Sequence, residues 1–184
     1  MWKRVTQTSL LVLGLMVAAV PAAGAQGTPA ETPANLNVPA HNVLQFTTYA
    51  TGVQTYVCKA RPDDATRFEW TFVAPTADLW NPAGEKIGTH YAGPTWEAAD
   101  GSKVAAKVVE RAEAAAPGAI PWLLLEATSH TGTGVFGEVS YIQRLETVGG
   151  IAPADGCDQA ADGTERAIEY TAQYAFFQQV SADQ

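Results

Sequence analysis

The chain has 184 residues and a formal net charge of −8, because 19 acidic side chains outnumber 11 basic ones. Such an acidic surface repels phosphate backbones, and no cluster of Lys and Arg offsets it, so nucleic acid is not an expected partner. The length suits one domain with a sizeable core.

The first 25 residues have the pattern of a cleavable export signal. Lys3 and Arg4 precede an apolar stretch from Ser9 to Val20, and the small residues of 23–25 follow it. A membrane anchor is the weaker alternative, because a helix that spans a bilayer needs roughly 20 apolar residues. We expect cleavage near Ala25 and a secreted, periplasmic or cell-envelope protein whose mature chain has no transmembrane segment.

Residues 26–42 are rich in Pro, Ala, Thr and Asn, which predicts a flexible lead-in. From residue 43 onward, apolar and polar residues alternate with a period of two. Five segments show this alternation or a strand-like apolar run: 52–58, 68–74, 121–127, 135–142 and 168–176. Strands at this spacing, separated by Gly and Pro, predict one all-β domain over residues 43–180. The fold class expected is a single-domain antiparallel β-sandwich or barrel-like fold, with the sandwich preferred.

Residues 102–116 are ambiguous, because they have the Ala and Glu content of a helix but alternate over 104–108. The surrounding strands favour a strand from about Lys103 to Val109. The period-two rows predict one shared core, which comprises Phe68, Trp70, Phe72, Leu123, Leu125, Ile168, Tyr170, Tyr174 and Phe176. Trp80 and Trp96 flank turn residues, which predicts partial exposure for both.

The chain has two cysteines, Cys58 and Cys157. In an exported protein such a pair predicts a disulfide. Two separately buried thiols are the alternative, and the wide separation does not match a zinc site.

Several short motifs are specific to one family. They are GTHYAGPTWE, DGSKV, IPWLLL and IQR-x-x-T-x-GG-x-x-P, in that order. In these motifs the chain resembles the DUF3455 family of secreted bacterial and fungal proteins, over about residues 43 to 178. The resemblance implies no particular activity. Some fungal members carry a malate-dehydrogenase label, which the sequence can test.

A glycine motif at residues 132–137 matches the G-x-G-x-x-G pattern of dinucleotide-binding sites. Such a site needs the glycines to open a helix that holds the pyrophosphate. Here they lead into a segment that alternates like a strand, so the motif predicts a turn. We therefore reject the dehydrogenase interpretation and expect no cofactor.

The stretch 88–104 combines aromatic, acidic and turn residues. In a catalytic interpretation, His90 would act with Glu97 or Asp100 as general base and acid. In a binding interpretation, a ligand would contact His90, Tyr91, Trp96, Asp100, Gln143 and Arg144. In a structural interpretation, these side chains only pack and hold loop backbone.

Four acidic residues lie close to Cys157 in the sequence: Asp155, Asp158, Asp162 and Glu165. Oxygen ligands on such a loop suit calcium, but the spacing is not that of a D-x-D-x-D-G loop. A solvated acidic loop is the preferred interpretation, and we expect no metal.

The sequence favours an exported, non-catalytic β-module that binds a small molecule or a cell-envelope polymer. A small secreted hydrolase that uses His90 is the first alternative. A purely structural or stress-related secreted protein is the second.

Overall fold

The computed structural model describes residues 31–181, and the export signal expected over residues 1–25 lies outside them. Two short 3-10 helices, η1 (Ala34–Leu36) and η2 (Gln159–Ala161), accompany eight strands. The strands are β1 (Asn42–Arg61), β2 (Asp64–Trp80), β3 (Lys86–Tyr91), β4 (Thr95–Ala98), β5 (Lys103–Ala112), β6 (Trp122–Thr131), β7 (Val139–Gly149) and β8 (Glu165–Gln179). Neither helix in the described part of the chain is long and apolar enough to cross a membrane.

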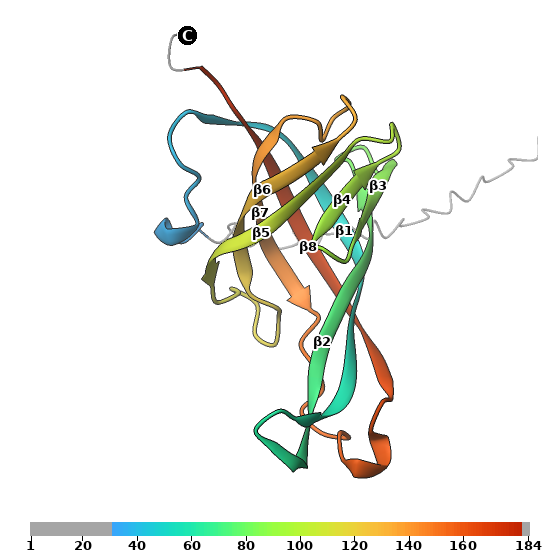
Figure 1. The fold of residues 1–184 in the computed structure, drawn as a ribbon. Helices are drawn as coiled ribbons and strands as arrows, with labels where there is room; N and C mark the ends of the chain where they lie inside the picture. Colours follow the sequence, from blue (N-terminus) through green and yellow to red (C-terminus); the bar gives the residue numbers. More distant parts are fainter. Residues whose placement is uncertain (1–30, 182–184) are drawn as a thin grey trace, which may run out of the picture.

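Each strand pairs antiparallel with the next one along the chain, and β8 pairs with β1. The sheet is therefore a closed barrel (Figure 1). The expected all-β antiparallel class is confirmed, but the preference for a sandwich is wrong, because a single sheet closes on itself. β5 also confirms the strand assigned to the ambiguous segment. Closure pairs the backbone of every strand on both sides, which an open sheet cannot do at its edges.

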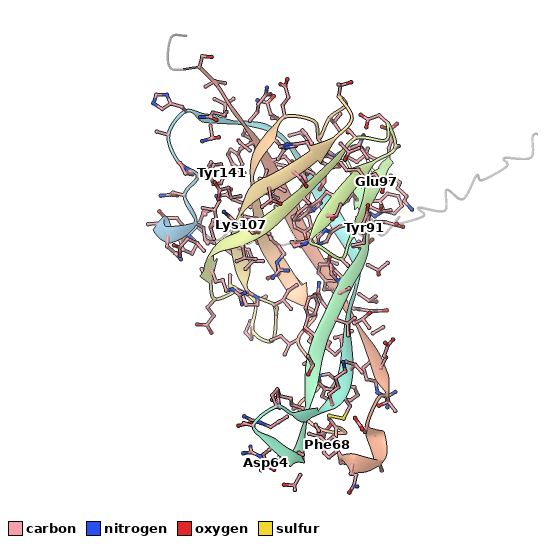
Figure 2. All side chains as sticks on the ribbon, in the orientation of Figure 1. Asp64, Phe68, Tyr91, Glu97, Lys107 and Tyr141 are labelled. Atoms are coloured by element: carbon pink, nitrogen blue, oxygen red, sulfur yellow. A yellow bond between two sulfur atoms is a disulfide. The ribbon has the colours of Figure 1, made fainter. Side chains whose placement is uncertain are left out.

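The strands differ in length, and this gives the molecule its shape. β1, β2 and β8 have 20, 17 and 15 residues, whereas β3 and β4 have six and four. The long strands therefore run past one end of the barrel and form a projecting arm (Figure 1). We define the arm as residues 57–71 and 155–166. Asp64 and Phe68 mark its tip in Figure 2.

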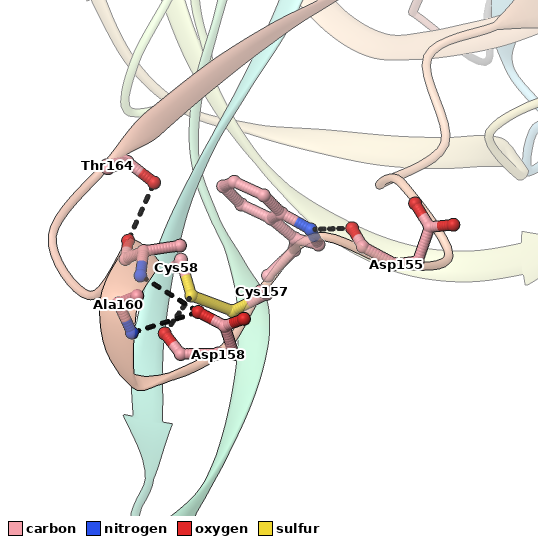
Figure 3. Close-up of a disulfide and its surroundings, with 8 residues drawn as sticks. Cys58, Asp155, Cys157, Asp158, Ala160 and Thr164 are labelled. Carbon is pink, nitrogen blue, oxygen red and sulfur yellow. Dashed lines mark hydrogen bonds between the residues drawn. A yellow bond between two sulfur atoms is a disulfide. The ribbon is translucent and has the colours of Figure 1, made fainter.

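A disulfide ties the two parts of the arm together. Cys58 on β1 is bonded to Cys157 in the segment before η2, with a Cα–Cα distance of 5.4 Å. The expected bond is confirmed (Figure 3). Beside it, the indole nitrogen of Trp70 donates to the carbonyl oxygen of Asp155 at 2.9 Å. The arm thus has its own fixed contacts away from the barrel core.

The opposite end of the barrel is closed by the loop between β6 and β7. Phe136 from this loop is fully buried and packs against Phe46 and Phe176, with ring centroids 5.8 and 5.0 Å away. Gly132 in the same loop has a φ of 75°, a conformation that glycine adopts without strain. The glycine motif therefore forms a turn that leads into β7, as the sequence predicted.

The predicted core is only partly correct. Leu123, Leu125, Tyr170, Tyr174 and Phe176 lie in the barrel core. The other four predicted members do not belong to it; they are Phe68, Trp70, Phe72 and Ile168.

Two features of β2 explain the error for Phe68, Trp70 and Phe72. Phe68 and Trp70 lie on the arm, beyond the barrel. Phe72 is 50% exposed where the arm leaves the barrel. The register against β1 shifts by one residue at Val73, and this bulge moves the following odd-numbered residues, Ala77 and Leu79, to the interior.

The N-terminal part of the described chain covers the outside of the barrel. Leu36 in η1 is fully buried and packs with Trp122 and Leu124 in a second apolar cluster. The amide nitrogen of Gln143 on β7 donates to the Leu36 carbonyl oxygen at 2.7 Å. The lead-in expected over residues 26–42 is thus packed against the sheet at Leu36 and Val38.

Candidate functional site

A cavity of about 510 Å³ opens at the end of the barrel from which the arm projects. Its walls include the apolar residues Phe72, Pro75, Val108, Ile120, Leu123 and Leu125. Polar side chains also reach it, namely those of Gln54, Tyr56, His90, Arg111, Arg144 and Tyr174. Apolar clefts of roughly 300 to 1,000 Å³ with a few polar groups are typical of small-molecule sites.

His90 lies in the interior at this end. Alternation along β3 turns it inward, where it is 3% exposed, and turns Tyr91 outward. Its Nδ1 is 2.9 Å from the carbonyl oxygen of Thr95. A carbonyl only accepts hydrogen bonds, so Nδ1 carries the proton and Nε2 of the neutral ring carries a lone pair.

Burial sets the charge of His90. Desolvation lowers its pKa to about 3; the charge of Arg144 acts in the same direction, and the hydrogen bond to Thr95 opposes it. The imidazole is therefore neutral at physiological pH. A base this weak accepts a proton from a substrate poorly.

Trp96 on β4 stacks on the His90 ring, with centroids 4.3 Å apart and planes 17° apart. The Tyr174 ring meets both edge-on, at centroid distances of 5.3 Å. Trp96 is 1% exposed, so its predicted partial exposure is wrong. The turn beside it faces the barrel mouth, and the side chain points into the barrel. Trp80, in contrast, is half-buried as predicted.

Arg144 on β7 is the cation whose charge acts on the buried cavity residues Tyr56, His90 and Tyr174. Its Nε and one terminal nitrogen donate to the Pro121 carbonyl oxygen at 3.1 and 2.8 Å. Within residues 31–181 it forms no salt bridge. Burial raises the pKa of Tyr174, and the charge of Arg144 acts against this rise. The hydroxyl therefore stays protonated beside an uncompensated cation.

Several buried polar atoms around the cavity have no hydrogen-bond partner among the described residues. They include the Tyr170 and Tyr174 hydroxyls, the Gln54 amide nitrogen and the Trp96 indole nitrogen. The two hydroxyls nevertheless lie close enough to each other, and to Gln54 and Arg144, for weak polar contacts to influence their pKa values. A buried donor without a partner costs about 1–3 kcal/mol.

Glu97 does not line the cavity that contains His90. On β4 it faces outward, where the Tyr91 hydroxyl donates to it at 2.8 Å and Lys103 forms a 3.0 Å salt bridge with it. Figure 2 shows Tyr91 and Glu97 close together on this side of the barrel. The hydrogen bond from Tyr91, followed by that from Lys103, lowers the pKa of Glu97. The two predicted site residues Tyr91 and Glu97 thus form a pair outside the cavity.

Asp100 lies at the closed end of the barrel. Its carboxylate accepts hydrogen bonds from the Ser102 amide and hydroxyl, at 2.8 and 2.6 Å, and from the Val135 amide at 2.9 Å. A Cβ at Gly134 would overlap this carboxylate, which explains the glycine. Asp100 therefore holds the loop that closes the barrel, and does not line the cavity.

Of the six residues predicted to bind a ligand, three line one cavity: His90, Trp96 and Arg144. Tyr91, Asp100 and Gln143 do not, and Gln143 instead binds the N-terminal segment on the outside of β7. Sequence reasoning missed Gln54, Tyr56 and Arg111, and it assigned Tyr174 only to the core. Alternation on β8 does place Tyr174 inside, but alternation does not reveal that a cavity lies beside it.

Two of the four acidic residues near Cys157, Asp155 and Asp158, form hydrogen bonds that hold the segment around η2. The Asp158 carboxylate accepts hydrogen bonds from the Ala160 and Ala161 amides and caps η2, and the Asp155 carbonyl binds Trp70 (Figure 3). In the described part of the chain, no three His, Cys, Asp or Glu residues are grouped so as to hold a metal ion.

The fold and cavity define a class: an up-and-down antiparallel barrel of eight strands, plugged at one end and hollow at the other. Barrels of this size can hold one small ligand. Residues 39–178 match the family described as "Protein of unknown function (DUF3455)", and the chain belongs to this family. The predicted family assignment is confirmed. No match was found among curated proteins or among solved structures.

Proposed function

We propose that this protein is an exported, non-catalytic binding module that holds one small, largely apolar ligand in the open end of its barrel. The observation that carries the proposal is the 510 Å³ cavity, whose wall is largely apolar and carries a few polar side chains. The disulfide supports export, since such bonds persist in oxidising compartments. Ligand binding in other eight-stranded barrels supports it only by analogy of fold.

The surroundings of His90 favour binding over hydrolysis. No carboxylate, serine or cysteine is among the residues that line the cavity. A hydrolytic site would need a nucleophile or an activated water there, with a base to take its proton. The neutral His90 is held by a backbone carbonyl and stacked on Trp96, which suits a fixed wall of a binding site.

Two neighbouring valines on β5 provide a matched test. Val108 lines the cavity, whereas Val109 is 39% exposed. We expect the purified protein to bind the neutral dye N-phenyl-1-naphthylamine saturably, as measured by its fluorescence. Val108→Trp fills the cavity and should weaken binding by about tenfold or more, because the excluded dye loses its apolar contacts. Val109→Trp should leave binding unchanged.

Circular dichroism and the melting temperature show whether both variants fold, since a larger side chain can strain a core. The proposal is overturned if the wild-type protein does not bind the dye saturably. It is also overturned if a folded Val108→Trp binds as tightly as Val109→Trp. A purely structural protein would give the first result, and a site for an envelope polymer on the outer surface would give the second.

A further inference from the structure

The charge that faces the cavity is opposite to the charge of the whole protein. The chain has a net charge of −8, yet the residues that line the cavity include two arginines and no acid. Arg111 is exposed at the rim, and Arg144 is half-buried within. Arg144 makes no salt bridge in the described part of the chain. An anion beside Arg144 would neutralise its charge and accept hydrogen bonds from the N–H groups that do not contact Pro121.

The neighbours of Arg144 offer mainly donors. Tyr174 keeps its hydroxyl proton because burial raises its pKa. This oxygen lies close enough to Tyr170 and Arg144 for both to act against that rise, although neither forms a hydrogen bond of good geometry with it. The indole N–H of Trp96 has no hydrogen-bond partner among the described residues. Arg144 itself has five N–H donors, and only Nε and one terminal nitrogen contact Pro121. The neutral His90 adds no charge, so the cavity combines one inner cation with neutral donors.

The rest of the wall is apolar. Val108, Ile120, Leu123 and Leu125 come from β5, β6 and the segment before β6, and Phe72 stands at the mouth beside the arm. Such a wall matches a hydrocarbon body and excludes a strongly hydrated ligand. A sugar is a poorer match, because the Trp96 face is already covered by His90.

We propose that the ligand is an apolar monocarboxylate. Its carboxylate pairs with the Arg144 guanidinium, and its hydrocarbon body lies along the aliphatic wall. Arg111 at the rim attracts the anion to the mouth. Arginine suits this role because its planar donor groups match the two oxygens of a carboxylate. The inference rests on the proposed function and specifies the ligand of the same site.

The test uses three ligands with the same ten-carbon chain: decanoate, decanamide and decylamine. At pH 7.5 they are an anion, a neutral molecule and a cation. Each is titrated into the purified protein loaded with N-phenyl-1-naphthylamine, and its affinity is read from dye displacement. We expect decanoate to bind roughly tenfold or more tightly than decanamide, and decylamine to bind most weakly, as a charge-assisted hydrogen bond predicts.

Two arginine variants locate the effect. Arg144→Gln should bring the affinity for decanoate close to that for decanamide. Arg67→Gln removes the same charge from the arm, where it is exposed, and should leave the preference intact. Since Arg144 also binds Pro121, the melting temperature of each variant is measured. Arg144→Lys keeps the charge, and should keep part of the preference for decanoate.

Equal affinity of the wild-type protein for decanoate and decanamide overturns the monocarboxylate inference and leaves the binding module intact. The same holds if the dye binds but none of the three ligands displaces it. A preference for decanoate that survives in folded Arg144→Gln also overturns the inference. If the dye itself does not bind, both proposals fail.

Discussion

At the scale of single residues, His90 links the stability of the barrel to pH. In the unfolded chain its pKa is near 6.5, whereas burial lowers it to about 3 in the folded protein. Between these values the unfolded state binds a proton that the folded state does not. The free energy of unfolding is therefore not reduced by His90 above about pH 6.5. As the pH falls from there toward 3, it decreases by at most about 1.4 kcal/mol per pH unit.

Urea unfolding between about pH 6.5 and 5 measures this slope before most carboxylates titrate. His90→Gln retains an amide donor for the Thr95 carbonyl but has no titrating ring, so its free energy of unfolding should depend much less on pH in this range. His41→Gln changes an exposed histidine and should keep the wild-type slope. Equal slopes for wild type and His90→Gln would contradict the assignment of a buried neutral imidazole.

At the scale of elements, the loop 132–137 depends on one carboxylate. Hydrogen bonds from Ser102, then from Val135, lower the pKa of Asp100. The resulting stabilisation is present above the ordinary carboxyl pKa and is lost as the pH falls through the lowered value. The same loop carries the buried Phe136, so the Asp100 carboxylate helps to hold the loop that closes this end of the barrel.

Asp100→Ala removes three acceptor contacts and leaves the Val135 amide without its partner. We expect the melting temperature to fall by several degrees, and the Val135 and Phe136 amides to exchange with solvent faster. Glu113→Ala, an exposed acid outside the loop, should change neither. Unchanged exchange at residues 135 and 136 in Asp100→Ala would contradict this role.

At the scale of the whole molecule, the disulfide joins the two parts of the arm that projects from the barrel. It closes a loop with a sequence separation of 99, for which chain entropy gives about 4.7 kcal/mol. β1 and β8 already pair at Val57 and Glu165, so the disulfide adds less order than in a free loop. We therefore expect the free energy of unfolding of the double variant Cys58→Ala/Cys157→Ala to fall by less than the chain-entropy value, by roughly 2–4 kcal/mol.

Urea unfolding measures the total loss, and hydrogen exchange locates it. Protection should fall most at residues 57–71 and 155–166, while the barrel strands β4 to β7 keep their relative protection. A uniform loss of protection in barrel and arm would show instead that the two unfold as one unit.

The sequence by itself determined the features that depend on neighbours along the chain. Alternation with a period of two identified the strands, including β8, and placed Tyr170, Tyr174 and Phe176 on one inward face. Two cysteines without a metal-binding spacing predicted their bond. Family motifs predicted the family. These features could be predicted because strand geometry and residue chemistry act locally.

Only the tertiary structure decided which strands reach past the barrel and which side chains meet. The length of β1 and β2 puts Phe68 and Trp70 on the arm, although their alternation matches a core strand. His90, on β3, and Arg144, on β7, line one cavity because the sheet closes on itself. Ring closure depends on registers between strands far apart in the sequence, and no local pattern encodes the space that it encloses.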